Sequence, residues 1–178
     1  MARPDWPTDA RDEGPFEASL KCCTFEPFLP NFTIGRLLSD GYDQARLSEA
    51  IGKGRLTPLG LLPASRENRD FGRSHSARCT FLDDRAQCTI WMHRPSVCRS
   101  YFCVSNVGAE GQAKWKAAEH QGNELEWTIA HEVAWDLGFT QDEINQGEWA
   151  EWLGRELEFF KKCTERAFGE FFNLSQND

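Results

Sequence analysis

The sequence lacks any long hydrophobic segment. No stretch approaches the roughly 18 consecutive apolar residues that a membrane-spanning helix requires. The first 15 residues hold charged side chains and three prolines, where a secretory signal would carry an uninterrupted apolar segment. We therefore expect a cytoplasmic protein that has no membrane among its partners.

Motifs for the familiar enzyme chemistries are also missing. The sequence contains no glycine-rich phosphate loop, no dinucleotide fingerprint and no nucleophile motif with a recognisable base. The stretch HEVAW at residues 131–135 resembles the start of a zinc-protease helix, but Trp135 stands where the second histidine would be. We expect His131 to pack between Trp127 and Trp135, each one helical turn away. The sequence leaves open whether the protein is an enzyme and whether it has a small-molecule substrate.

No internal repeat divides the chain. A chain of 178 residues with 40% hydrophobic content can bury one core, so we predict a single domain over residues 1–178. Within it we expect a cysteine-rich metal-binding part at residues 20–105 and a helical part at residues 109–172. The predicted fold class is mainly α (α+β), a helical domain with a small β-hairpin and an irregular cysteine-rich region.

The chain has seven cysteines, an odd number that cannot pair completely. In a reducing compartment, a chain this rich in cysteine is more typical of metal binding than of disulfide bonding. Cys163 stands alone among helix-forming residues, and we predict that it is a core residue. The other six lie within the first 103 residues, and we predict that they are metal ligands: Cys22, Cys23, Cys79, Cys88, Cys98 and Cys103.

Charge is distributed unevenly along this acidic chain, which has a net charge of −8. Residues 64–109 alone are net positive, with seven basic against four acidic side chains, and they hold four of the six candidate ligands. Arginines near metal-bound thiolates offset negative charge and donate hydrogen bonds to sulfur. We expect Arg94 and Arg99 to do this beside the centre, whereas a solvated loop is the alternative for Arg66, Arg69, Arg73, Arg78 and Arg85. The overall acidity disfavours nucleic acid as a partner, and a protein or redox partner is the expectation that remains.

Local patterns in the first 105 residues predict short elements. Residues 1–35 are rich in proline and aromatic side chains and indicate an irregular segment. One or two short helices are predicted from Arg36 to Gly52, with an interruption near Gly41, and residues 56–76 look like a loop. Two short strands, Cys79–Leu82 and Cys88–Trp91, are predicted around a polar turn, and a helix is predicted to begin at Pro95.

The remainder of the chain carries helical signals. A helix is predicted over Ala109–Leu137, with Gly122 as its candidate interruption and Gly138 as its end. Thr140 and Glu143 form the pattern of a capping box, which indicates that a new helix begins there. Between Glu148 and Phe172, apolar residues recur near helical spacing, and we assign this stripe to the core: Trp149, Trp152, Leu153, Leu157, Phe160, Phe168 and Phe171.

The second cysteine block resembles that of a bacterial family of cysteine-cluster proteins described as a zinc- or iron-chelating domain. The matching positions are Cys79, Phe81, Leu82, Cys88, Ile90, Arg94, Pro95, Cys98, Arg99 and Cys103. The family's first block, C-x3-C-x2-C-C, is matched only by Cys22 and Cys23, because Pro15 and Ser19 occupy the earlier positions. The resemblance covers residues 20–105 and implies a metal site rather than a reaction. The chain is also similar, more distantly, to the cysteine-rich part of flagellin lysine methylases, which implies an iron–sulfur cluster.

The cysteine spacing bears on which metal is bound. No C-x2-C knuckle of the kind common in zinc proteins occurs. Eight, nine and four residues separate the successive cysteines from Cys79 to Cys103, which places the thiols on separate turns or strands. This arrangement suits a [4Fe–4S] cluster as readily as one ion, and thiolates bind zinc, copper(I) and iron–sulfur centres alike. We favour an iron–sulfur cluster over a zinc or iron ion, and we expect a role in electron transfer, redox sensing or support of a partner. The alternatives are a metal- or cluster-dependent enzyme with an open coordination site and a structural zinc protein.

The adjacent pair Cys22 and Cys23 raises a separate question. Neighbouring residues in an extended chain point to opposite sides, so the two thiols are poorly placed to bind one ion. Our hypothesis is that all six cysteines line one pocket, and the alternative is that at least one of this pair is a buried thiol without a ligand role. His93, between the second and third cysteines of the later block, is a further candidate ligand, although six thiols make its participation unnecessary.

Overall fold

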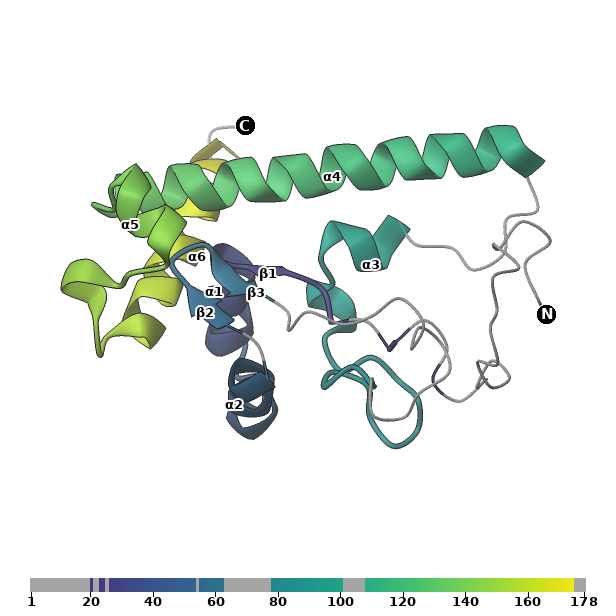
Figure 1. The fold of residues 1–178 in the computed structure, drawn as a ribbon, viewed down its shortest axis with the longest axis horizontal. Helices are drawn as coiled ribbons and strands as arrows, with labels where there is room; N and C mark the ends of the chain where they lie inside the picture. Colours follow the sequence, from purple (N-terminus) through teal and green to yellow (C-terminus); the bar gives the residue numbers. More distant parts are fainter. Residues whose placement is uncertain are drawn as a thin grey trace.

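The computed structural model describes residues 20, 23–24, 26–53, 55–62, 78–100 and 108–174. These residues are mainly helical, with one small antiparallel sheet, so the predicted fold class is confirmed. The long helix α4, Gly108–Asp136, runs along one side of the molecule. Helix α3 packs under its first half, and α1, α6 and the sheet lie under its second half (Figure 1). No helix among the described residues is long and apolar enough to cross a membrane.

Helix α1, Asn31–Ser39, starts at a fully buried asparagine that joins three parts of the chain. The Asn31 side chain accepts a hydrogen bond from Phe32 N (2.7 Å) and donates to the carbonyls of Pro58 (3.0 Å) and Ala130 (2.9 Å). Helix α2, Gln44–Lys53, follows after Gly41, whose φ of 72° ends the first helix. The predicted pair of helices broken near Gly41 is confirmed, with the first helix beginning earlier than predicted.

A three-stranded sheet forms where the sequence indicated irregular chain and loop. Its strands are β1, Leu29–Pro30, β2, Arg55–Thr57, and β3, Gly60–Leu62, in the order β1-β3-β2. The predictions of irregular chain through residue 35 and of a loop from residue 56 are therefore wrong here. Strands of two or three residues are too short to show an alternating pattern. Gly60 permits the close approach, because a Cβ there would lie 2.0 Å from the Leu29 carbonyl oxygen.

The segment from Cys79 to Trp91 forms a tight turn rather than the predicted pair of strands. Only an isolated bridge joins Leu82 to Cys88, and Thr89 N donates to Phe81 O at 2.8 Å. The side chain of Asp83 accepts hydrogen bonds from the backbone N–H groups of residues 85 and 87, which shapes the loop as a side-chain-stabilised turn. The chain then enters a short 3-10 helix, η3, Trp91–His93. The prediction of strands at 79–82 and 88–91 is thus wrong, although the chain reversal is present.

Helix α4 continues through Gly122, contrary to the predicted interruption. Gly122 faces Ser96 at the start of helix α3, Ser96–Ser100, and a Cβ on the glycine would lie 2.7 Å from Ser96 Cβ. Both the N–H and the hydroxyl of Ser96 donate to the Glu126 carboxylate at 2.8 Å. The glycine therefore permits a close helix contact. The predicted helix after Pro95 is confirmed as far as the described residues extend.

The C-terminal part contains two further α-helices, α5, Gln141–Gln146, and α6, Glu156–Leu174. Thr140 and Glu143 form the predicted capping box, and Gly147 closes α5 with a φ of 72°. The apolar stripe is interrupted at Gly154, so Leu153 and Leu157 are exposed, contrary to their assignment to the core. The assignment is confirmed for the buried Trp152 and Phe160, and Phe171 lies outside the residues whose side chains are described.

Helix α6 closes the core against helix α1. Phe159, Phe160 and Cys163 of α6 are fully buried in the core, which confirms the prediction for Cys163. The Thr164 hydroxyl donates to the Phe32 carbonyl at 2.7 Å, and a Cβ on Gly35 would overlap the Phe160 carbonyl oxygen. The beginning and the end of the described chain therefore share one core.

Candidate metal centre

Four of the six predicted ligands lie within the described residues. Cys79 is buried, whereas Cys23, Cys88 and Cys98 are half-buried, and all four are present as thiols. Cys22 and Cys103 lie outside the described residues. The structure therefore describes the surroundings of four predicted ligands, which come from three separate parts of the chain: the Cys23 segment, the turn from Cys79 to Cys88 and the helix that carries Cys98.

The first cysteine segment lies directly beside the second block. Cys79 N donates to Cys23 O at 2.7 Å, and Cys23 N donates to Leu20 O at 3.0 Å in a short turn. Leu20 is itself buried and anchors this segment. Residues 56 positions apart in sequence are thus held together by a backbone hydrogen bond, which places Cys23 against the second block.

Cys79 interacts electrostatically with two other candidate ligands. Burial raises the pKa of the Cys79 thiol to about 12, the backbone N–H of Phe81 opposes this rise, and the nearby charges of Glu26, Cys98 and Cys88 add to it. Cys88 reaches the site through its bridge to Leu82, and Leu82 N donates to Cys79 O at 3.0 Å. The charges of Cys88 and Cys98 therefore act on the Cys79 thiol, although more weakly than its burial does.

Cys98 is positioned by the contact between α3 and α4. Its N–H donates to Pro95 O at 3.0 Å in the first turn of α3. The neighbouring Ser96 is hydrogen-bonded to Glu126, whose pKa is raised by burial against the lowering effect of those hydrogen bonds. The α4 helix therefore fixes the helix that carries this thiol.

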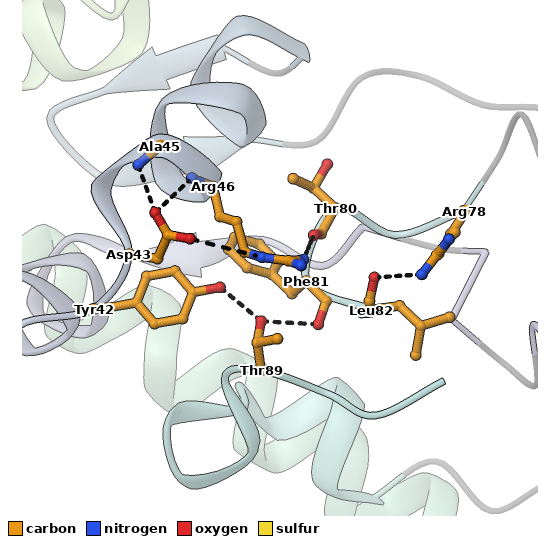
Figure 2. Close-up of polar contacts among 9 residues, drawn as sticks. All are labelled: Tyr42, Asp43, Ala45, Arg46, Arg78, Thr80, Phe81, Leu82 and Thr89. Carbon is orange, nitrogen blue, oxygen red and sulfur yellow. Dashed lines mark hydrogen bonds and ion pairs between the residues drawn. The ribbon is translucent and has the colours of Figure 1, made fainter. Parts of the chain in front are cut away.

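Polar contacts tie the cysteine turn to the start of α2 (Figure 2). The hydroxyl groups of Tyr42 and Thr89 are 2.6 Å apart, and Thr89 donates to Phe81 O at 3.0 Å. Arg46 donates to the carbonyl of Thr80 at 3.3 Å, beside Cys79. Burial raises the pKa of Tyr42 despite its hydrogen bond with Thr89, so the phenol remains a neutral donor. These contacts hold the backbone on both sides of the turn.

Arg78 holds the same turn from its outer side. Its guanidinium donates to the carbonyl of Leu82 at 3.0 Å (Figure 2). It also donates to the Asp84 carboxylate at 3.2 Å. Arg85 is exposed, as the solvated-loop alternative predicts. The other three arginines named with it, at positions 66, 69 and 73, lie outside the described residues.

A buried carboxylate beside the thiols escaped the sequence analysis. Glu26 is 5% exposed, and its Oε1 accepts hydrogen bonds from Thr80 N (3.1 Å) and Thr80 Oγ1 (2.5 Å). Its charge contributes to the raised pKa of Cys79. Glu26 and Thr80 are 54 positions apart, and no local sequence pattern connects them. The neighbouring Cys22 and Cys23 provided the only signal in this segment.

The side chains of Arg94, Arg99 and His93 make specific contacts around the turn after Ile90. Arg94 stacks on the Trp91 ring, with 3.5 Å between Cζ and the ring centroid, and its Nε is buried without a hydrogen-bond partner among the described residues. Arg99 donates to the carbonyls of Met92 and Arg94. His93 Nε2 lies 3.2 Å from Asp40 Oδ2. The buried Nε of Arg94 is therefore a donor that could serve a sulfur or another acceptor.

The donor chemistry fits zinc or iron, because thiolates are strong ligands for both. Within the described ranges, no group of three or more His, Cys, Asp or Glu side chains is arranged to hold a metal ion. A complete centre therefore needs Cys22 or Cys103, or a closer approach of the described thiols.

Comparison with known proteins yields one family match. A family model named CxxCxxCC and described as a "putative zinc- or iron-chelating domain" matches residues 18–127, and so extends past residue 105 into helix α4. The pattern in that name would place its first two cysteines at positions 16 and 19, where this chain has Phe16 and Ser19. No curated protein and no solved structure gives a match to this chain.

Proposed function

The chain belongs to the cysteine-cluster family described as a zinc- or iron-chelating domain, and from this premise we propose that it binds one metal centre through cysteine thiolates. The centre lies where the Cys23 segment, the turn from Cys79 to Cys88 and helix α3 meet. The observation that carries the proposal is the 2.7 Å hydrogen bond from Cys79 N to Cys23 O, which joins the two cysteine segments that the sequence predicts to supply ligands.

We infer that the centre is an iron–sulfur cluster, which supplies one-electron chemistry when bound. Three features support this inference: six cysteines exceed the four that one tetrahedral ion needs, no C-x2-C knuckle occurs, and the thiols come from separate segments. Burial around Cys79 excludes water from the centre, and the positive charges of Arg94 and Arg99 offset thiolate charge. The function that follows is electron transfer, redox sensing or support of a protein partner in a reducing compartment such as the cytoplasm.

Anaerobic purification tests both parts of the proposal. We expect a coloured protein with iron and acid-labile sulfide, and we expect Cys79→Ser and Cys98→Ser variants to lose most of the bound metal. Cys163→Ala is the matched control, because this buried core thiol lies outside the centre, and its metal content should stay at the wild-type level. A colourless protein with one zinc per chain would refute the cluster and retain the metal site.

The ligand variants decide the site itself. If Cys79→Ser and Cys98→Ser keep the full metal content while Cys163→Ala loses it, the proposed centre is wrong. Separate Cys22→Ser and Cys23→Ser variants then show which member of the adjacent pair is a ligand. A variant that binds as much metal per chain as the wild type would remove its substituted cysteine from the ligand set. Circular dichroism on each variant distinguishes loss of a ligand from unfolding, because a variant that loses metal through a missing ligand keeps its helical spectrum.

A further inference from the structure

A groove of about 490 Å³ runs along one face of helix α4. The described residues that line it include two tryptophans, two glutamates and two histidines: Trp127, Trp135, Glu124, Glu132, His120 and His131. The lining extends from residue 120 to residue 135, which corresponds to about 22 Å along a helix. A groove of this length suits an extended ligand better than a compact one.

Aromatic rings form a fixed row along the groove. Phe28 stacks on Trp127 with 4.3 Å between ring centroids and an interplanar angle of 10°. His131 lies 5.9 Å from Trp127 and 6.0 Å from Trp135, which confirms its predicted position between them. Its Nδ1 is 2.9 Å from the Trp127 carbonyl oxygen. The rings are held in place and yet exposed, with 37% of Trp127 and 48% of Trp135 accessible to solvent.

Glutamates are the formally charged side chains among the described residues that line the groove. Glu124 and Glu132 line it, and no lysine or arginine is found among the described lining residues. Among the described residues, the Glu124 carboxylate is paired with the exposed His120 at 3.7 Å. Asp136, one turn beyond Glu132, is instead paired with Arg166 at 2.7 Å. The Glu132 carboxylate has no such cation among the described residues, so the part of the groove that the structure describes combines aromatic faces with carboxylates that lack a lysine or arginine partner there.

We propose that this groove binds an arginine-bearing extended segment of a partner protein. A guanidinium group stacks on tryptophan faces and forms paired hydrogen bonds with a carboxylate, and the groove offers both kinds of contact side by side. The overall charge of −8 also attracts a basic partner. This interaction goes beyond metal binding and does not depend on it.

The test is titration of the full-length protein with a 12-residue peptide in which arginine alternates with serine. Isothermal titration calorimetry and tryptophan fluorescence report the affinity. We expect binding to weaken about tenfold in Trp135→Ala and about threefold to tenfold in Glu132→Gln, because each removes one of the two contact types. The same peptide with citrulline in place of arginine should not bind detectably, and a lysine version should bind more weakly than the arginine version.

Matched controls separate this site from general attraction to an acidic protein. Trp115→Ala changes an exposed tryptophan on the same helix outside the groove, and Glu148→Gln removes an exposed carboxylate beyond α5. Both should bind the arginine peptide as the wild type does. Equal losses in the control and groove variants would overturn the proposal, as would equal binding of the arginine and citrulline peptides. Light scattering completes the test, since self-association abolished by Trp135→Ala would assign the groove to a second copy of the chain instead.

Discussion

Burial dominates the chemistry of Cys79. The thiol lies in the core and its pKa is raised to about 12, so at neutral pH it carries its proton in the metal-free protein. A thiol binds metal as the thiolate, and that proton must therefore be released when a metal binds. Raising the pH therefore favours the metal-bound form, and lowering it favours the metal-free, protonated thiol.

We expect the zinc affinity of the metal-free protein to rise with pH between 6.5 and 8.5. Each proton released adds about one unit to the slope of log affinity against pH. Competition with a chromophoric chelator at several pH values measures the slope. The Cys79→Ser variant should show a slope smaller by about one unit, in addition to weaker binding. An equal slope in both proteins would mean that Cys79 does not lose a proton on binding.

The contacts of some residues could be predicted from the sequence, and the contacts of others could not. The place of His131 between two tryptophans was predictable, because all three lie on one helix at one-turn spacing. The burial of Glu26 against Thr80 was not, because their contact exists only after distant segments meet. The same reason limits the prediction for Arg94, whose stacking on Trp91 depends on the turn after Ile90.

Among the helices and strands, local sequence signals predicted where a helix ends better than they predicted which elements contact one another. The capping box at Thr140 and the glycines at 41 and 138 act through nearby backbone, and all three are confirmed. The pairing of β1 with β3 and the continuous α4 depend instead on tertiary partners, whereas β2 and β3 form a local hairpin whose strands are too short to show an alternating pattern. Gly122 illustrates the difference, since the same residue type that interrupts a helix by propensity here permits α3 to approach α4.

Gly122→Ala should therefore destabilise the protein and weaken metal binding, although alanine favours a helix. The added Cβ would lie 2.7 Å from both Cβ and Oγ of Ser96, and displacing α3 would move Cys98. We expect a loss of about 1–2 kcal/mol in the free energy of unfolding, as overpacking outweighs the gain in propensity. Urea denaturation and metal analysis measure the two effects.

Two comparisons make the Gly122 prediction specific. Gly169→Ala on α6 meets open space and should stabilise the protein by about 0.5–1 kcal/mol through propensity alone. Adding Ser96→Gly to Gly122→Ala removes the overlapping atoms and should restore the metal content, even though the hydroxyl bond to Glu126 is lost. If Gly122→Ala proves as stabilising as Gly169→Ala, the helix contact is looser than described.

At the scale of the whole molecule, the matched family region and the core do not coincide. The family match ends at residue 127, whereas Phe159 and Phe160, among the largest fully buried side chains, lie on α6 beyond it. Helix α6 packs on α1, which lies inside the matched region, through the contact of Gly35 with the Phe160 backbone. The metal-binding part therefore relies on the C-terminal helix for its core, a dependence that motif spacing alone does not reveal.

A fragment limited to residues 18–127 should consequently fail to fold and should lose most of its metal. Deleting the side chain of one buried phenylalanine costs about 3–5 kcal/mol, so losing α6 exceeds the total stability typical of a small domain. Circular dichroism, thermal unfolding and metal analysis compare the fragment with the full chain. Gly35→Ala in the full chain is the subtler test, because it disturbs the α1–α6 contact without deleting residues and should destabilise the fold while leaving every cysteine in place. A fragment that unfolds cooperatively and binds metal like the full chain would show that α6 is an appendage rather than part of the core.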